Sequence, residues 1–591
     1  MVRKKTLEWK VCMLGIIALC ALKFVTAFLN LPTKEHNYYS WYQDNDHYTW
    51  ILNTLEAQEK GISTIHHIDW DGGPKGRDSH WAGGLLNTLR AGALIAQTSG
   101  LSFKQALLVS LPFSLATLYS LLVLLSYLLA ARLLGPPIGA WLTLAMYSNI
   151  VFVFHLHPLG VDHPAILLFS LFLCLLGILG LFVSKLKTEA ACISAIGTAI
   201  GIWTSAVNMI PVILPTMAGL FIAIIIGGPH IRQIKAIHWK IWGITGGITT
   251  LCFYFIEYRV GDPIWLESNN PLYALSMFAG GYTLAYARPI NWRVVPTVLL
   301  AATPLFYKIH YGIKMAVETT YLRRHMELIT EAQPMPPNHM WFFGAIGIAV
   351  FVVAYLETNG FKDWAITIPF ALGGYVLAIL GMVSQRILPY AIVTLIFLVF
   401  VSIYAVKSKI WREILFCLLI VSILQGLTTT ALTTGNMEKL WPNKAKYFSN
   451  VAAAANVIKE DAYKNGRKIH LLTQIETAPT FAFYTGGVTY GGPYWETVKQ
   501  MNLDSKLMLE TDMDTAHKLL TDMDVTYIAV SQNMNLLSYP VLGEEAFNGN
   551  AKWFGSSIFY PVNTPKFLTP LPNSKGQLAP ECGYMLYRVN Y

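Results

Sequence analysis

Three acidic residues in separate polar segments are the best candidates for chemistry in this sequence. Asp162 lies in the run Gly-Val-Asp-His-Pro between two long apolar stretches, Asp46 follows the first apolar stretch, and Glu331 lies in a later polar segment. A carboxylate beside hydrocarbon is costly, so Asp162 is a functional candidate, although a loop acid is often only solvated. Mg²⁺ and Mn²⁺ prefer carboxylate oxygens, and the three acids therefore suggest a divalent cation site beside a phosphorylated lipid.

Histidine and arginine residues accompany these acids, either close to them in the sequence or at the start of a later apolar stretch. His163 could give the cation a nitrogen ligand, or it could orient Asp162 through a hydrogen bond. Arg386 opens an apolar stretch, where its planar fork suits a phosphate, although an arginine at a helix end often only anchors the helix. Arg323 and Arg324 lie shortly before Glu331. Spacing along the chain does not bring these residues together, so the fold must do so.

The composition indicates a membrane protein. Of the 591 residues, 54% are hydrophobic and 13% are charged, and the mean hydropathy is +0.44. Soluble proteins carry about 25% charged residues. The net charge of +9 does not indicate nucleic acid binding, because the basic residues cluster in short loops, where they set membrane orientation. The first apolar run is long enough to span, so no cleavable signal peptide is needed, and the seven cysteines form no CxxC metal motif.

Apolar stretches predict about thirteen transmembrane helices. The weakest stretch, 270–288, is counted as a crossing because only then do the basic loops stay on the cytoplasmic side along the whole chain. The predicted spans lie at about 11–29, 105–133, 138–155, 163–184, 189–206, 209–228, 239–256, 270–288, 294–310, 340–357, 364–383, 387–406 and 411–432.

This orientation places the candidate residues on one face of the membrane. A basic N-terminus stays in the cytoplasm, so the loop at 30–104, the turn with Asp162 and the loop at 311–339 all lie outside it. We therefore predict a transmembrane domain at 1–432 and an extracytoplasmic α/β domain at 433–591. Strand-like runs in the latter are Ile469–Leu472, Tyr527–Val530 and Tyr584–Tyr587. An interfacial helix is expected from about Ala82 to Thr98.

With this layout the sequence resembles the membrane glycosyltransferases of the GT-C fold, in particular the catalytic subunit of oligosaccharyltransferase. Asp46 matches the first-loop aspartate of that family and Asp162 its second acidic motif. Leu328-Ile329-Thr330-Glu331 is the nearest match to the Thr/Ser-x-x-Glu motif of the fifth outer loop. The sequence is more similar to a bacterial branch, through His80-Trp81, the run at Asp162, Arg386-Ile387-Leu388-Pro389-Tyr390 and Gly492-Pro493-Tyr494-Trp495.

The sequence departs from the family at several positions. The Trp-Trp-Asp element with which oligosaccharyltransferases recognise the glycosylation sequon is absent, and Tyr494-Trp495-Glu496 is the nearest run, which argues against asparagine as the acceptor. Leu328 stands where Thr or Ser is expected. Pro164 replaces a possible metal ligand, and Asn208 stands where the bacterial branch has an acid.

The resemblance implies a transferase acting on the periplasmic face of a bacterial inner membrane. It would move a sugar or oligosaccharide from a polyprenyl phosphate or pyrophosphate to a glycan, lipid or protein. Asp46, Asp162, His163 and Glu331 would hold the divalent cation, and one of the acids would act as general base. The donor phosphate would be held by Arg386, with assistance from His80, Arg323 and Arg324.

Two other functions are compatible with the sequence. A lipid-linked saccharide flippase or transporter would also have many spans, but transporters place ionisable residues near the bilayer midplane, whereas the acids here gather at one face. A non-catalytic membrane sensor with a ligand-binding tail is the second alternative.

Overall fold

The fold is seen in a computed structural model. It describes residues 2–31, 45–79, 81–149, 152, 155–258, 268–287, 294–304, 365–383, 385–405, 408–433, 442–474, 477–491, 498–531, 553–559, 564–572 and 583–591. The predicted span 340–357 and the predicted loop 311–339 lie outside these residues.

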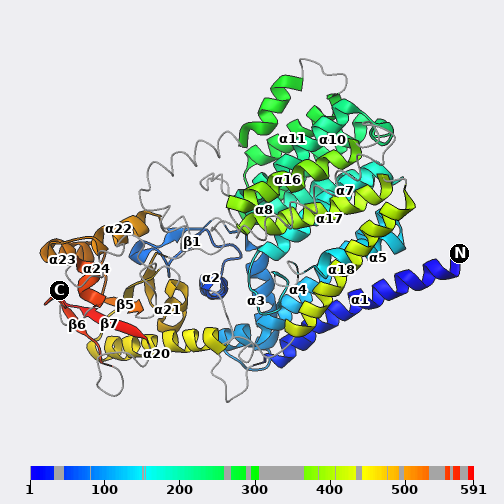
Figure 1. Cartoon of the computed structure of the whole chain (residues 1–591). Coiled ribbons are helices and arrows are strands. Elements are labelled where there is room, and N and C mark those ends of the chain that lie inside the picture. The colour runs from blue at the N-terminus through cyan, green and yellow to red at the C-terminus, as the bar shows by residue number, and fades with distance from the viewer. Residues whose placement is uncertain are drawn as a thin grey trace.

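Most of the described chain is helical, and the long helices pack side by side in one bundle (Figure 1). Judged by length and apolar composition, six described helices could cross a membrane. The helices of the bundle are α1 (Val2–Leu29), α4 (Phe103–Leu134), α5 (Pro136–Tyr147), α7 (Pro164–Val183), α8 (Lys187–Ile226), α9 (Pro229–Arg232), α10 (Ala236–Glu257), α11 (Pro271–Tyr286), Val294–Pro304, η3 (Ala365–Thr367), α16 (Ile368–Val383), η4 (Gln385–Ile387), α17 (Leu388–Ala405) and α18 (Lys409–Thr433).

Two features of these helices bear on the prediction. Helix α8 consists of two helical segments that meet at a kink at Ser205, whose backbone is extended (φ −163°, ψ 97°), and these segments correspond to the predicted spans 189–206 and 209–228. Pro211 and Pro215 follow the break, and a proline inside a helix removes a backbone hydrogen bond and favours a kink. The helix expected over 138–155 ends earlier, since α5 stops at Tyr147.

Helix α7 lies at the centre of the bundle, and nearly all of its residues are buried. It packs closely on α8 because small residues line the contact, as is usual between membrane helices. A Cβ atom on Gly177 would lie 2.4 Å from the carbonyl oxygen of Ala190, and one on Gly197 would lie 2.6 Å from Cβ of Leu173. These glycines therefore fix the distance between the two helices that flank the candidate site.

The loop predicted at 30–104 folds over one end of the bundle. Its described elements are α2 (Asn45–Glu59), β1 (His67–Ile68), η1 (Gly73–Lys75), β2 (Arg77–Asp78) and α3 (Gly83–Gln97). The helix expected from about Ala82 to Thr98 coincides with α3.

A mixed five-stranded sheet forms the C-terminal part of the chain, in the strand order β4-β3-β5-β7-β6. The three predicted strand-like runs coincide with β3, β5 and β7. Strand β3 pairs in parallel with β4 and β5, while β7 is antiparallel to β5 and β6. The elements are α20 (Pro442–Asn465), β3 (His470–Thr473), α21 (Ala478–Thr485), β4 (Val488–Tyr490), α22 (Val498–Met508), α23 (Met513–Asp522), β5 (Tyr527–Ser531), α24 (Phe554–Phe559), β6 (Leu568–Pro570) and β7 (Tyr584–Val589).

The first loop joins this sheet at its β4 edge. Asp71 forms a parallel bridge with Thr489, the backbone N–H of Gly72 donates to the carbonyl of Thr489 (3.0 Å), and the N–H of Thr489 donates to the carbonyl of Trp70 (2.9 Å). Addition of an extended segment to an exposed sheet edge satisfies backbone groups that would otherwise face water. The first loop is therefore attached both to the helical bundle and to the C-terminal sheet (Figure 1).

Candidate functional site

The centre of the candidate site is the Asp162–His163 pair in the turn before α7. The ring Nδ1 of His163 donates to Oδ1 of Asp162 at 2.7 Å, and the backbone N–H of His163 donates to the same oxygen at 2.7 Å. The side chain of Asp162 is 27% exposed, whereas that of His163 is 3% exposed. The carboxylate therefore faces outward while the imidazole supports it from behind.

The pKa of Asp162 reflects this arrangement. Burial raises the pKa, but the charge and hydrogen bond of His163 lower it more, and the charge of Arg386 acts in the same direction. The net pKa of Asp162 lies below the usual value of an aspartate. The structure thus presents Asp162 as an ionised carboxylate at neutral pH, which is the form that binds a cation or accepts a proton.

A kink in α8 supplies the second contact of His163. Nδ2 of Asn208 lies 3.4 Å from Nε2 of His163 and donates a hydrogen bond to Oγ of Ser205 (3.1 Å), the residue at the break. Both ring nitrogens of His163 are therefore engaged by neighbouring side chains. This fits the orienting role of His163 better than the role of a metal ligand, which needs a free ring nitrogen.

Two tryptophans of the first loop enclose His163. Trp81 packs edge-on against the imidazole with ring centroids 4.2 Å apart, and Trp50 lies 5.7 Å from Trp81 and 6.5 Å from His163. Asp46 lies one helical turn before Trp50 in α2, so the two side chains share a helix face. That Asp46 joins Asp162 in one site stays a prediction.

Two buried side chains of the bundle hydrogen-bond to the backbone of the turn that precedes Asp162. The hydroxyl of Tyr119 in α4 donates to the carbonyl of Gly160 (2.7 Å), and Nζ of Lys23 in α1 donates to the carbonyl of Leu156 (2.9 Å). Both side chains are buried, where an unmade hydrogen bond is costly. Helices α1 and α4 therefore fix the backbone that leads to Asp162.

Arg386 lies in the short helix η4, and its side chain is exposed. Its charge lowers the pKa of Asp162, so the guanidinium is within electrostatic range of the carboxylate. The predicted neighbours His80, Arg323, Arg324 and Glu331 lie outside the described residues.

Whether the site can bind a divalent cation depends on its carboxylate side chains. Among the described residues there is no group of three His, Cys, Asp or Glu side chains that could hold a metal ion. Mg²⁺ usually keeps several waters and needs only one or two carboxylates together with substrate phosphates. The partly exposed carboxylate of Asp162 therefore fits as one ligand for an ion that is completed by the donor phosphate, and the contribution of Asp46 stays a prediction. A cation site with Glu331 as a third acid stays a prediction.

Sequence reasoning missed several residues that shape the site. Lys23 carries a detectable signal, because a charged side chain inside an apolar stretch is a functional candidate. Trp50 and Tyr119 resemble ordinary core aromatics, so their roles emerge only from the fold.

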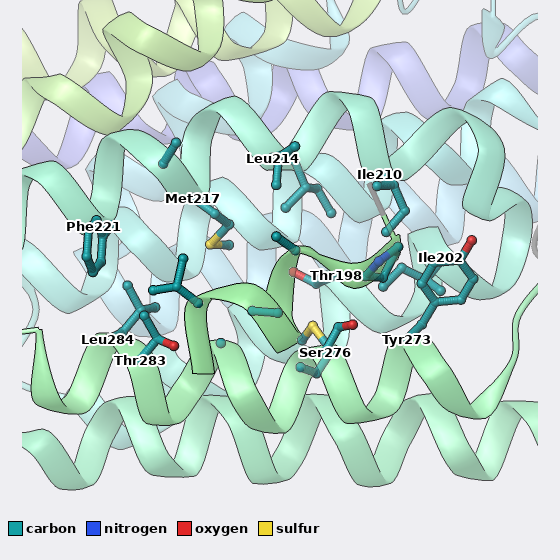
Figure 2. Close-up of a pocket in the computed structure, with 18 of the residues that line it drawn as sticks. Thr198, Ile202, Ile210, Leu214, Met217, Phe221, Tyr273, Ser276, Thr283 and Leu284 are labelled. Carbon is teal, nitrogen blue, oxygen red and sulfur yellow. The ribbon is translucent and has the colours of Figure 1, made fainter. Parts of the chain in front are cut away.

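A separate apolar cavity of about 290 Å³ lies among the helices (Figure 2). It is bounded by α8, α10, α11 and the helix Val294–Pro304, and side chains such as Ile210, Met217 and Leu284 point into it. Its wall contains few polar side chains, among them Thr198, Ser276 and Thr283. Such a lining suits hydrocarbon rather than a polar ligand.

Comparison with solved structures identifies the fold. The archaeal oligosaccharyltransferase AglB from Archaeoglobus fulgidus, in complex with an inhibitory peptide and a dolichol-phosphate, superposes with a TM-score of 0.63 at 13% identity, covering 90% of this chain and 70% of AglB. The same enzyme tethered to an acceptor peptide with the NVT sequon gives a TM-score of 0.62 at 13% identity, and the match covers 91% of this chain and 72% of the enzyme. Its complex with Zn and sulfate gives a TM-score of 0.59 at 13% identity, and the match covers 88% of this chain and 68% of the enzyme. The chain therefore has the fold of a GT-C glycosyltransferase. No protein-family model and no curated protein sequence matches it.

Proposed function

We propose that this protein is a membrane glycosyltransferase that uses a polyprenyl phosphate or pyrophosphate sugar as donor. The observation that carries the proposal is the Asp162–His163 pair, in which the imidazole orients the carboxylate and is itself covered by Trp81 of the first loop, in a fold shared with an oligosaccharyltransferase. In the proposed topology thirteen helices cross a bacterial inner membrane. The site and the domain at 433–591 then lie on the periplasmic side, as the basic loops require.

Charges of the site suit a phosphorylated donor. Arg386 would bind a donor phosphate through its planar fork, and Asp162 with Asp46 and Glu331 would hold the divalent cation. When bound, that cation would neutralise the charge that develops on the leaving phosphate. One structure of AglB contains a dolichol-phosphate and another contains Zn and sulfate, which supports a phosphorylated lipid and a divalent cation as ligands of the site proposed here.

Each bond of the reaction has a place in this scheme. The bond between the anomeric carbon and the phosphate oxygen breaks, and its electron pair leaves with the polyprenyl phosphate or pyrophosphate. The acceptor nucleophile forms a new bond to the same carbon and gives its proton to Asp162 or Asp46. The acceptor would be a glycan, lipid or protein that binds to the domain at 433–591.

The test uses full-length protein in nanodiscs with radiolabelled lipid-linked saccharides extracted from host membranes. Wild type should transfer label to an envelope acceptor, and Asp162→Asn should lose nearly all transfer. Glu189→Gln is the matched control, because Glu189 only forms an exposed ion pair with Arg132. Full transfer by both Asp162→Asn and Glu331→Gln would show that the assigned site is wrong. Movement of label across liposomes without transfer would instead support a flippase.

A further inference from the structure

Glu257 is a buried carboxylate at the C-terminal end of α10, and no motif in the sequence draws attention to it. It is 4% exposed. Its Oε1 accepts a hydrogen bond from the backbone N–H of Gly83 (2.8 Å), and its Oε2 accepts one from Nε1 of Trp203 (2.9 Å). The backbone carbonyl of Glu257 accepts from Nε2 of His66 (2.9 Å). One residue thus ties together α10, the first loop and α8.

The first connection runs from Glu257 to Trp81. Gly83 is the first residue of α3, where backbone N–H groups lack partners within the helix and attract a carboxylate. Trp81 lies two residues earlier and packs edge-on against His163. Fixing Gly83 therefore fixes the chain that carries Trp81 onto the imidazole.

The second connection runs from Glu257 to Asn208. Trp203 stacks on Phe253 of α10 with ring centroids 4.6 Å apart, so the hydrogen bond to Glu257 locks an already packed indole. The break at Ser205 follows directly, and Asn208 then contacts Nε2 of His163. The two connections start at the two oxygens of one carboxylate and end at two contacts of one imidazole, the ring of Trp81 and the amide of Asn208.

We propose that Glu257 is a positioning residue for the Asp162 site, acting through Trp81 and Asn208 on His163. The inference rests on the proposed function only for its effect on transfer; the effect on His163 is independent of it. A carboxylate suits this position because two N–H donors converge on it and each needs an acceptor. In Glu257→Gln one acceptor remains, and the amide NH₂ faces the other donor.

The first measurement needs no activity. Full-length protein is treated with diethyl pyrocarbonate, and modification of each histidine is read by peptide mass spectrometry. His163 is shielded in the wild type, and in Glu257→Gln its modification should rise by roughly tenfold, as loss of a buried charged hydrogen bond implies. Exposed His230 in α9 is the internal reference and should not change.

Two further variants separate positioning from general damage. Trp203→Phe keeps an aromatic ring but loses the N–H, so it should expose His163 even if Glu257→Gln folds poorly. Asp461→Asn is the matched control, because Asp461 also accepts from two side chains, Tyr527 (3.0 Å) and Arg588 (3.0 Å), but lies in the C-terminal part. It should leave His163 as shielded as in the wild type.

The second measurement is a double-mutant cycle on transfer activity. Glu257→Gln should lower kcat by roughly tenfold with little change in KM for the lipid-linked saccharide, because donor contacts are kept. In an Asn208→Ala background the same change should cost much less, since one connection is already cut. Unchanged His163 modification in both Glu257→Gln and Trp203→Phe, or full additivity with Asn208→Ala, overturns the positioning role. Absence of transfer by wild type would count against the proposed function alone, because the His163 measurement still decides the inference.

Discussion

The ring of Trp81 packs edge-on against the ring of His163, with centroids 4.2 Å apart. Trp81 belongs to the first loop, and His163 precedes α7 in the bundle, so this contact closes the candidate site from the side of the loop. The same loop adds to the C-terminal sheet at Thr489. The position of Asp162 therefore depends on three parts of the chain at once.

Removal of the imidazole should change the pH dependence of transfer. His163 lowers the pKa of Asp162 against the opposing effect of burial, so in His163→Gln that pKa should rise. Asp162 then loses its charge at a higher pH, and the acid limb of the rate profile should move upward. Initial rates measured between about pH 4 and 8 check this, since the usual aspartate pKa is about 3.9. The control is His67→Gln, which changes an exposed histidine and should leave the acid limb of the rate profile in place. An unshifted acid limb in His163→Gln would contradict the effect of His163 on the pKa of Asp162.

Loss of the Tyr119 hydroxyl should loosen the turn that leads to Asp162. Tyr119→Phe leaves the carbonyl of Gly160 without its 2.7 Å donor, at a cost of about 1 kcal/mol in stability. Transfer should fall several-fold as the turn moves. Tyr147→Phe is the control, because Tyr147 is equally buried but bonds Ser126 (2.6 Å) away from the turn. Thermal unfolding should report similar losses for both variants, whereas only Tyr119→Phe should reduce transfer.

A side chain added at Gly73 should disturb the junction between the first loop and the C-terminal sheet. A Cβ atom there would lie 2.4 Å from Cε1 of Tyr490, and the backbone has φ +75°. Gly73→Ala should therefore separate the loop from β4 and expose it to limited proteolysis. Gly466→Ala tests the backbone effect alone, because Gly466 has φ +59° but open space around it, and should cost only roughly 1–2 kcal/mol. Equal protease resistance of the two variants would show that the close contact is unimportant.

The C-terminal part should lose stability as the pH rises, because of Asp504. Burial raises the pKa of Asp504 to about 7, and its Oδ1 has no hydrogen-bond partner among the described residues. An acid whose folded pKa is raised stabilises the fold fully below its unfolded pKa. That stability is lost as the pH rises towards the folded pKa, at about 1.4 kcal/mol per pH unit. Between about pH 4 and 7 the wild type should therefore become less stable, whereas Asp504→Asn should change less.

Thermal unfolding of the full-length protein at several pH values, followed by tryptophan fluorescence, measures this difference. Asp512→Asn is a suitable control, because Asp512 is an exposed helix cap whose pKa is lowered by Thr515. A wild type and an Asp504→Asn variant with parallel pH profiles would contradict the buried-acid explanation.

Much of the architecture was predictable from local patterns. Apolar length predicts helices that cross hydrocarbon, and the described helices coincide with the predicted stretches, including the two segments of α8 on either side of Ser205, except that α5 ends early. The strand runs at β3, β5 and β7 also coincide with the prediction, since their apolar and β-branched residues match a buried sheet. The assignments of His80, Arg323, Arg324 and Glu331 stay predictions.

The sequence by itself determined the membrane class, the helical stretches and the candidate acids, because hydropathy and residue type act locally along the chain. Only the tertiary structure decided which groups meet Asp162. The four residues that contact the turn come from separate segments, namely Lys23, Tyr119, Trp81 and Asn208. Their contacts depend on how α1, α4, the first loop and the kinked α8 pack around the turn. The contacts of Glu257 also depend on the tertiary structure, because its two donors lie far from it in sequence: Trp203 meets it through the packing of α8 on α10, and Gly83 meets it only when the first loop folds over the bundle.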